Sequence, residues 1–240
     1  MEKKHVIFFI ILLLLIIGFI IAFNVISDLN DETKIKNEIK EISEVFTIAN
    51  IDNENVNEIL DRKVIKKGIY ADIEVGIKQY YKNLYSDLKN LTFLLDADNF
   101  TNYLSSKNIT EDGPIFLKSR SNLNNSKAQI IEYYDKFTKS LSNNNTKLSY
   151  INQNEKKYYI DFYLELTNLA LPENFESSLK DEYDNALNNI EIYIKAFDFL
   201  YANRSNWEIR NTELVFEDAT ILDEYMQVID QLNKTKKEKE

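Results

Sequence analysis

The sequence contains no cysteine and a single histidine, His5, and these two shortages exclude most catalytic constellations. Without cysteine there is no disulfide, no thiol nucleophile and no acylated cysteine of the kind that anchors a lipoprotein. The one histidine lies directly before a long apolar run, so a Ser-His-Asp triad or a histidine-rich metal site is excluded from the rest of the chain. The sequence therefore predicts a protein that is not an enzyme, with no catalytic residue, no cofactor and no metal site.

Glycine and proline are also scarce, with four glycines and two prolines in 240 residues. This shortage of turn-forming residues argues against many short strands and favours long helices. The glycines are isolated in the sequence and form no phosphate-binding loop, so a nucleotide-dependent enzyme is not expected. We predict an all-α fold, in which an N-terminal transmembrane helix precedes an irregular bundle of about six to seven helices.

Positive charge is limited, and the net charge is −10. Before the C-terminal tail the only basic cluster is small and consists of Arg62, Lys63, Lys66 and Lys67. Binding to a polyanion depends on lysine and arginine neutralising phosphates, so no nucleic-acid partner is expected.

A long hydrophobic run is present near the N-terminus. No charged residue occurs in Val6–Phe23, and the apolar segment Val6–Ile26 supplies the roughly 20 helical residues that cross a bilayer core of about 30 Å. We predict a short tail over 1–5 and a transmembrane helix over 6–26 that contacts membrane lipid. A cleaved signal peptide with Lys3 and Lys4 as its basic start is the alternative. Secretory apolar regions span only about 7–15 residues, which favours a retained anchor.

The charges that flank the run favour a domain outside the cytoplasm. Lys3 and Lys4 precede it, and acidic residues follow it. Three further lysines, Lys34, Lys36 and Lys40, lie within the window that the positive-inside rule counts and oppose this orientation. We predict a single-pass protein of the cell membrane with an extracytoplasmic helical domain over 27–232 and a charged, frayed tail over 233–240.

Helical periodicity dominates the first half of the domain, which is long enough for one core or two small ones. One stripe, from a helix that begins near Asp31, contains Ile35, Ile39, Ile42, Phe46 and Ala49. A short helix at 56–60 precedes the clearest helix, where an apolar face from Ile73 to Leu95 leaves Lys78, Lys82, Asp87 and Lys89 on the remaining surface. Further helices are predicted over 96–106 and up to Leu141, separated by a loop at 108–114 and followed by a break at 142–146.

The second half contains one ambiguous segment. Residues 158–169 fit both strand alternation and helical spacing, and we predict a helix because helices flank the segment. A long helix follows Pro172 and ends near Asn203, and a final helix spans 221–232. Between them, Trp207 to Phe216 is predicted as a small hairpin or an extended arm.

Three short motifs carry a resemblance: Gly68-Ile69-Tyr70 before a long helix, Tyr158-Tyr159-Ile160-Asp161, and Trp207 to Phe216 followed by Tyr225. Together they make the chain similar to uncharacterised single-pass membrane proteins of Gram-positive bacteria with AT-rich genomes. The resemblance implies the same layout of anchor and domain, and it supplies no activity, cofactor or active residue.

Carboxylates are the remaining candidates for chemistry. Asp96, Asp98 and Asn99 are similar to the start of a calcium loop, but Phe100 takes a ligand position and no glycine follows, so helix capping is favoured. Asp161 and Glu165, one helical turn apart, suit an acid–base pair for glycoside hydrolysis, although a solvated helix face is the preferred interpretation. The same interpretation applies to Asp181, Glu182 and Asp184, and to Asp218, Asp223 and Glu224.

Tyrosine is abundant, and the pairs Tyr80-Tyr81, Tyr133-Tyr134 and Tyr158-Tyr159 are predicted to be core aromatics at helix interfaces. The leading functional hypothesis is a membrane-tethered interaction or accessory module that acts through a protein partner. The alternatives are a ligand-binding sensor that works through a membrane partner and, less favoured, a carboxylate-dependent wall hydrolase.

Overall fold

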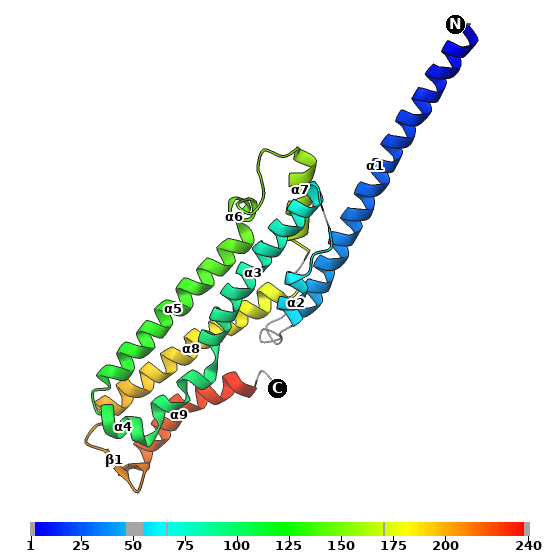
Figure 1. Ribbon diagram of the computed structural model, residues 1–240. Helices are drawn as coiled ribbons and strands as arrows, with labels where there is room; N and C mark the ends of the chain where they lie inside the picture. The colour runs from blue at the N-terminus through cyan, green and yellow to red at the C-terminus, as the bar shows by residue number, and fades with distance from the viewer. Residues whose placement is uncertain (1–2, 47–54, 66, 170, 238–240) are drawn as a thin grey trace. The chain divides into compact units, whose positions relative to one another are not determined.

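The computed structural model describes residues 3–46, 55–65, 67–169 and 171–237, and the side chains of 13–46, 56–65, 67–169 and 171–232. Within these ranges the chain forms nine α-helices, one 3-10 helix and one two-stranded sheet (Figure 1). The chain divides into two compact units, residues 1–84 with 143–172 and residues 85–142 with 173–240. The all-α class, the long apolar N-terminal helix and the small hairpin are confirmed.

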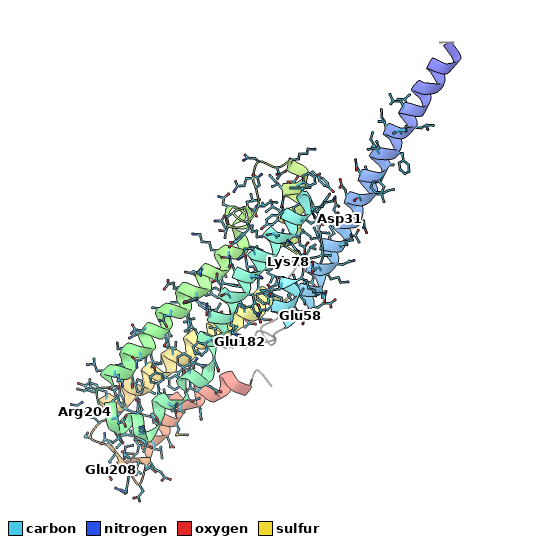
Figure 2. All side chains as sticks on the ribbon, viewed as in Figure 1. Asp31, Glu58, Lys78, Glu182, Arg204 and Glu208 are labelled. Atoms are coloured by element: carbon cyan, nitrogen blue, oxygen red, sulfur yellow. The ribbon has the colours of Figure 1, made fainter. Side chains whose placement is uncertain are left out.

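Helix α1 is continuous over Lys3–Val45, so the anchor and the first predicted domain helix are one element (Figure 1). The described part of its apolar half, from Leu13 to Leu29, is exposed, and its side chains project outside the rest of unit 1 (Figure 2). Helix α1 is long and apolar enough to cross a membrane. A signal sequence near the N-terminus passes the same test of length and composition. The stripe predicted in its second half is confirmed through Phe46, because those side chains are at most 1% exposed. Ala49 lies outside the described residues.

Unit 1 is completed by elements that pack around the second half of α1. These are α2 (Asn55–Asp61), the part of α3 (Ile69–Leu95) up to Leu84, α6 (Asn144–Leu148) and α7 (Lys157–Thr167). Tyr81 on α3 is fully buried and donates a hydrogen bond of 2.8 Å to the carbonyl oxygen of Leu166. Tyr163 on α7 is also fully buried and donates to the carbonyl oxygen of Lys147 at 2.9 Å. Tyrosine rings therefore fill this core, and their hydroxyls donate to buried carbonyl oxygens near the ends of α7 and α6.

The ambiguous segment 158–169 is helical, as predicted. Four side chains at helical spacing, Phe162, Tyr163, Leu166 and Thr167, are buried, whereas strand alternation would place Tyr158 on the buried face. Tyr158 is instead 56% exposed, so its prediction as a core aromatic is wrong.

Unit 2 contains the C-terminal part of α3, η2 (Ala97–Leu104), α4 (Ser106–Asp112), α5 (Leu117–Ser142), α8 (Phe175–Ala202), the hairpin and α9 (Ala219–Lys237). Aromatic stacking joins its helices. The Phe116 and Phe197 rings stack at 4.6 Å, and Tyr134 stacks on Tyr183 at 4.0 Å. Helix α9 continues beyond Leu232 to Lys237, through most of the segment predicted as a tail.

The hairpin pairs β1 (Trp207–Arg210) with β2 (Glu213–Phe216) in antiparallel register, Trp207 opposite Phe216. Asn211 and Thr212 connect the strands at φ values of 53° and 66°, the positive angles that a two-residue turn of type I′ requires. Trp207 is tied down because its indole Nε1 donates to the carbonyl oxygen of Leu200 at 2.7 Å.

The loop predicted at 108–114 is wrong over 108–112, because α4 extends to Asp112. Ser105 caps this helix by accepting from the amide of Asn108 at 3.2 Å. The Asn108 side chain donates to the Tyr103 carbonyl and the Ser119 hydroxyl. Composition does not reveal these bonds. Likewise, the break predicted at 142–146 is short, since Asn143 caps α6.

Candidate functional site: a buried carboxylate–lysine cluster

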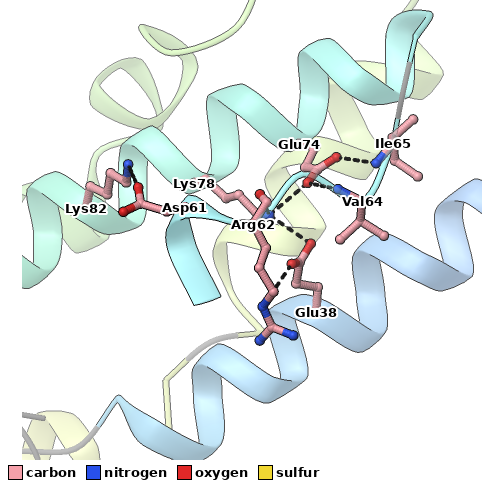
Figure 3. Close-up of polar contacts among 8 residues, drawn as sticks. All are labelled: Glu38, Asp61, Arg62, Val64, Ile65, Glu74, Lys78 and Lys82. Carbon is pink, nitrogen blue, oxygen red and sulfur yellow. Dashed lines mark hydrogen bonds and ion pairs between the residues drawn. The ribbon is translucent and has the colours of Figure 1, made fainter. Parts of the chain in front are cut away.

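Three charged side chains meet inside unit 1, between α1 and α3 (Figure 3). Lys78 Nζ on α3 lies 2.7 Å from Glu74 Oε1 on the same helix and 2.9 Å from Glu38 Oε2 on α1. The three residues are between 2% and 5% exposed. We call them the buried charge cluster. It is the link between the helix that carries the apolar run and the central helix of the unit.

Lys78 has three oxygen neighbours, two in hydrogen bonds and one in an ion pair. Besides the two carboxylates, Nζ donates to the carbonyl oxygen of Arg62 at 2.5 Å, in the segment between α2 and α3 (Figure 3). Lys78 therefore joins α1, α3 and the α2–α3 connection through one atom.

Glu74 is held by the backbone of that same connection. Its Oε1 accepts from the amide of Val64 at 2.8 Å, and its Oε2 accepts from the amide of Ile65 at 2.7 Å. Burial would raise the pKa of Glu74, but the bonds from Lys78 and the two amides outweigh it and hold the pKa below its ordinary value of 4.5. Glu74 is therefore a satisfied, ionised carboxylate.

Glu38 is less well satisfied. Its cationic neighbours are Lys78 and, at 3.9 Å, Arg62 Nε, whose guanidinium pairs more closely with Glu41 at 2.7 Å. Burial raises the pKa of Glu38 above 4.5, although Lys78 acts in the opposite direction. The surroundings thus raise the pKa of Glu38 and lower that of Glu74, although both carboxylates pair with the same ammonium group.

A small cavity of about 190 Å³ opens beside the cluster. Its lining comes from the end of α2, the following segment and α3, and consists of Leu60, Asp61, Arg62, Lys63, Glu74, Val75, Lys78, Gln79 and Lys82. Lys82 pairs with Asp61 at its edge. Lys63 is exposed and has no ionic partner among the described residues.

A second cluster lies nearer the apolar half of α1. Glu32 Oε1 accepts hydrogen bonds from the hydroxyl of Tyr70 at 2.7 Å and from the hydroxyl of Tyr158. Burial and the bond to Glu32 raise the pKa of Tyr70 far above its ordinary value, so this phenol is a fixed donor. Two residues of the motifs that carry the resemblance therefore meet on one residue of α1.

The carboxylates singled out in the sequence belong neither to the buried charge cluster nor to the cluster around Glu32. Asp96 caps η2, its side chain accepting from the amide of Asp98 at 3.0 Å, which confirms the capping interpretation. Asp161 and Glu165 are exposed, and Glu165 pairs with Lys36 at 2.8 Å, which confirms a solvated face.

The two acidic groups of unit 2 also lie on or near the surface. Asp184 pairs with Lys180, and Asp218 accepts from the amide of Thr220 at 2.7 Å at the start of α9. Asp181, Asp223 and Glu224 are exposed, and Glu182 is half-buried. Among the described residues, no three His, Cys, Asp or Glu side chains gather as metal ligands. The side chain of His5 lies outside the described part.

The sequence predicts only that Lys78 lies off the apolar Ile73–Leu95 face, and it predicts neither the burial of Lys78 nor the buried charge cluster. A second stripe on α3 contains the signal: Glu74 and Lys78 are followed at helical spacing by Tyr81 and Tyr85, both buried. Helix α3 is buried on two faces and exposed on a strip that contains Val75 and Gln79, and charges on either buried face must pair. Comparison of the chain with protein-family models, curated proteins and solved structures gives no match.

Proposed function

We propose that the chain is a single-pass membrane protein that holds a non-enzymatic helical module outside the cytoplasm and acts through contacts with a protein partner. The continuity of α1 carries the proposal. A helix whose first half is apolar and exposed enters the core of unit 1 without a break, and Glu38 in its second half is locked to Lys78. A helix that spans the membrane would therefore hold unit 1 at a fixed distance from the membrane.

Exposed apolar side chains support a protein partner. At the junction of α4 and α5, Ile115 and Leu117 are 61% and 74% exposed, on either side of the fully buried Phe116. Phe116 adopts φ 56°, a left-handed conformation that costs a non-glycine residue about 1–2 kcal/mol. Its stacking on Phe197 compensates for that cost, and the turn presents both neighbours to solvent. A surface of this kind suits a protein contact.

The buried charge cluster supports the absence of catalysis. A carboxylate-dependent hydrolase needs an acid and a base that a substrate can reach. Glu38 and Glu74 do converge, but an ammonium group lies between them and each is at most 5% exposed. Their role in the proposal is to fix the register of α1 against α3, the best-attested use of buried ion pairs.

Membrane extraction and cysteine labelling test the tether. Because the chain has no cysteine, Glu44→Cys on α1 gives a single labelling site. We expect the protein to stay in the membrane pellet after alkaline carbonate treatment, and a membrane-impermeant maleimide to label intact cells. A variant with Ile16→Lys and Ile20→Lys should be released. Labelling that occurs only after lysis would overturn the extracytoplasmic placement.

Site-specific photocrosslinking tests the contact. A photoreactive residue at Leu117 should give a discrete covalent adduct in native membranes, whereas one at Lys107, exposed on α4, should not. If neither Ile115 nor Leu117 gives an adduct, action through this surface fails.

A ligand-binding sensor is the second candidate, and the cavity beside the cluster is the observation that favours it. Among the cations that line it, Lys63 has no ionic partner in the described part of the chain, and Lys82 pairs only with the exposed Asp61. A small anion is therefore the chemistry that fits. Succinate or inorganic phosphate at a hundredfold excess over its dissociation constant would stabilise the fold by about 2.7 kcal/mol. A thermal shift that disappears in Lys63→Ser with Lys82→Ser would favour the sensor over the interaction module.

A further inference from the structure

The end of unit 1 that faces the apolar half of α1 combines two exposed features, a tyrosine and three lysines. Two pairs of contacts fix which end this is. Along α1, Glu32 contacts Tyr70 of α3, and Glu38 contacts Lys78 of α3. Helix α3 therefore runs in the same direction as α1 and begins on the side of the anchor.

Helix α7 has the same orientation. Its Tyr158 bonds to Glu32, and its Glu165 pairs with Lys36 one turn farther along α1. Figure 1 shows the first turns of α3 and α7 on the side of unit 1 from which the apolar half of α1 extends. The segments that precede these helices are thus the part of unit 1 nearest to the anchor.

The continuous helix sets the height of this end. Glu32 lies six residues beyond Ile26, which is about 9 Å along an α-helix at about 1.5 Å per residue. The headgroup layer adds roughly 5–8 Å to each side of the hydrocarbon core. Tilt of α1 brings the end of unit 1 closer still. Residues just before Tyr158 are therefore within reach of lipid phosphates.

The exposed side chains at this end suit that surface. Lys67 precedes α3, and Lys156 and Lys157 begin α7; all three are exposed and have no ionic partner among the described residues. Tyr158 next to them is 56% exposed, and tyrosine is enriched at membrane interfaces. Lys156 is the N-cap of α7 and makes no side-chain capping bond, so the positive end of the helix also points this way.

Two of the acidic residues of α1 near this end of unit 1 already have partners within the chain. Asp31 pairs with Lys34 at 3.0 Å, and Glu32 accepts from two phenols. Asp28, one turn nearer the anchor, is exposed and opposes anionic lipid on the α1 side. On the α7 side, Lys156 and Lys157 outnumber the half-buried Glu155, which accepts from the side-chain amide of Asn152 at 3.1 Å, so the charge there is complementary to phosphate.

We propose that the start of α7, Lys156 to Tyr158, rests on the headgroups of anionic phospholipids, so that unit 1 has a second membrane contact besides the anchor. The proposal rests on the tether proposed above. With α1 as one support and α7 as the other, rotation of unit 1 about the axis of the anchor is restricted. The module then presents the same side to the membrane at all times.

Depth-dependent quenching tests the contact in the full chain. A fluorophore on Asn154→Cys, two residues before Lys156, is compared with one on Glu44→Cys, about 18 Å farther along α1 than Glu32. Both proteins are reconstituted in vesicles of phosphatidylcholine and phosphatidylglycerol in equal parts, with nitroxide-labelled headgroups. We expect quenching several-fold stronger at residue 154. Equal quenching at the two sites would overturn the proposal.

The lysines are tested in the same background. Lys156→Gln with Lys157→Gln should reduce quenching at residue 154 several-fold, whereas Lys40→Gln, exposed on α1, should leave it unchanged. No loss in the double variant, together with equal quenching in phosphatidylcholine alone, would overturn the role of the lysines. Flotation of each sample with the vesicles is measured first. Protein that fails to float contradicts the tether, and protein that floats without selective quenching contradicts the second contact alone.

Discussion

Glu38 on α1 and Lys78 on α3 form an ion pair of 2.9 Å with side chains that are 5% and 7% exposed. Bringing both charges out of water costs several kcal/mol each, which their attraction recovers only with good geometry and further hydrogen bonds. Those additional bonds come from Glu74 and the Arg62 carbonyl. These bonds belong to Lys78, whereas both carboxylate oxygens of Glu38 are buried without a hydrogen bond, so the pair contributes to the specific register of α1 against α3 more than to stability.

Removal of the ammonium group should unfold unit 1 readily. Lys78→Met keeps the length and apolar stem of the side chain but leaves two buried carboxylates without their shared cation, at a cost of about 3–5 kcal/mol. Urea unfolding of the detergent-solubilised chain, followed by circular dichroism, measures the change. Lys40→Met on the exposed side of α1 is the matched control and should stay within about 0.5 kcal/mol of the wild type. Equal effects of the two variants would show that the cluster is energetically unimportant.

The two carboxylates should give pH effects of opposite sign. The pKa of Glu38 is raised on folding, so its contribution to stability is present below pH 4.5 and is lost as the pH rises through the folded pKa. The pKa of Glu74 is lowered, so its contribution is present above pH 4.5 and is lost as the pH falls through the folded pKa. Both signs follow from burial winning at Glu38 and hydrogen bonds winning at Glu74.

Amide substitutions separate these effects. Glu38→Gln should reduce the loss of stability on raising the pH above 4.5, and Glu74→Gln should reduce the loss on lowering it below 4.5. Unfolding free energies measured across this range in both variants and the wild type give the comparison. Glu44→Gln, exposed on α1, is the control that should change neither limb. Because the pKa values of Asp112 and Glu191 are also lowered, some loss of stability at low pH remains in the Glu74 variant; a loss as large as that of the wild type would contradict the assignment.

Helices are predictable from the sequence where one apolar stripe is present, as on α1 and α8. The environment of a residue is not predictable where it depends on contacts with other elements. Lys78 lies off the apolar Ile73–Leu95 face, so its burial is not predicted from that stripe; it depends on Glu38, forty residues away. Composition predicts a loop at Asn108, although tertiary bonds to Tyr103 and Ser119 release it from that role. Such pairings come from packing, which local periodicity does not encode.

The phenol at residue 70 should contribute more to stability than an exposed one. Tyr70→Phe removes a partly buried hydrogen bond to the Glu32 carboxylate, and bonds to charged groups contribute about 1.5–3 kcal/mol. The ring contacts with Tyr159 and Phe162 remain, so the loss reports the hydroxyl. Tyr133→Phe, at a half-buried position on α5, serves as the control and should cost less than about 0.5 kcal/mol. If Tyr70→Phe is equally mild, Glu32 does not hold α3 to α1.

Gly76 on α3 should be intolerant of alanine although it lies inside a helix. Alanine is favoured over glycine in a helix interior by about 1 kcal/mol, so propensity alone predicts a gain in stability. A Cβ atom at this position would lie 2.5 Å from the carbonyl oxygen of Tyr150, a backbone atom of unit 1 that cannot rotate away. The cost of overpacking, typically about 1–3 kcal/mol, should therefore exceed the gain.

Gly18→Ala on α1, where a Cβ would meet nothing within 4 Å, is the control and should be neutral or stabilising. Urea unfolding of both variants gives the test, and a Gly76→Ala protein as stable as the wild type would mean that the segment around Tyr150 does not pack against α3 as closely as the structure shows.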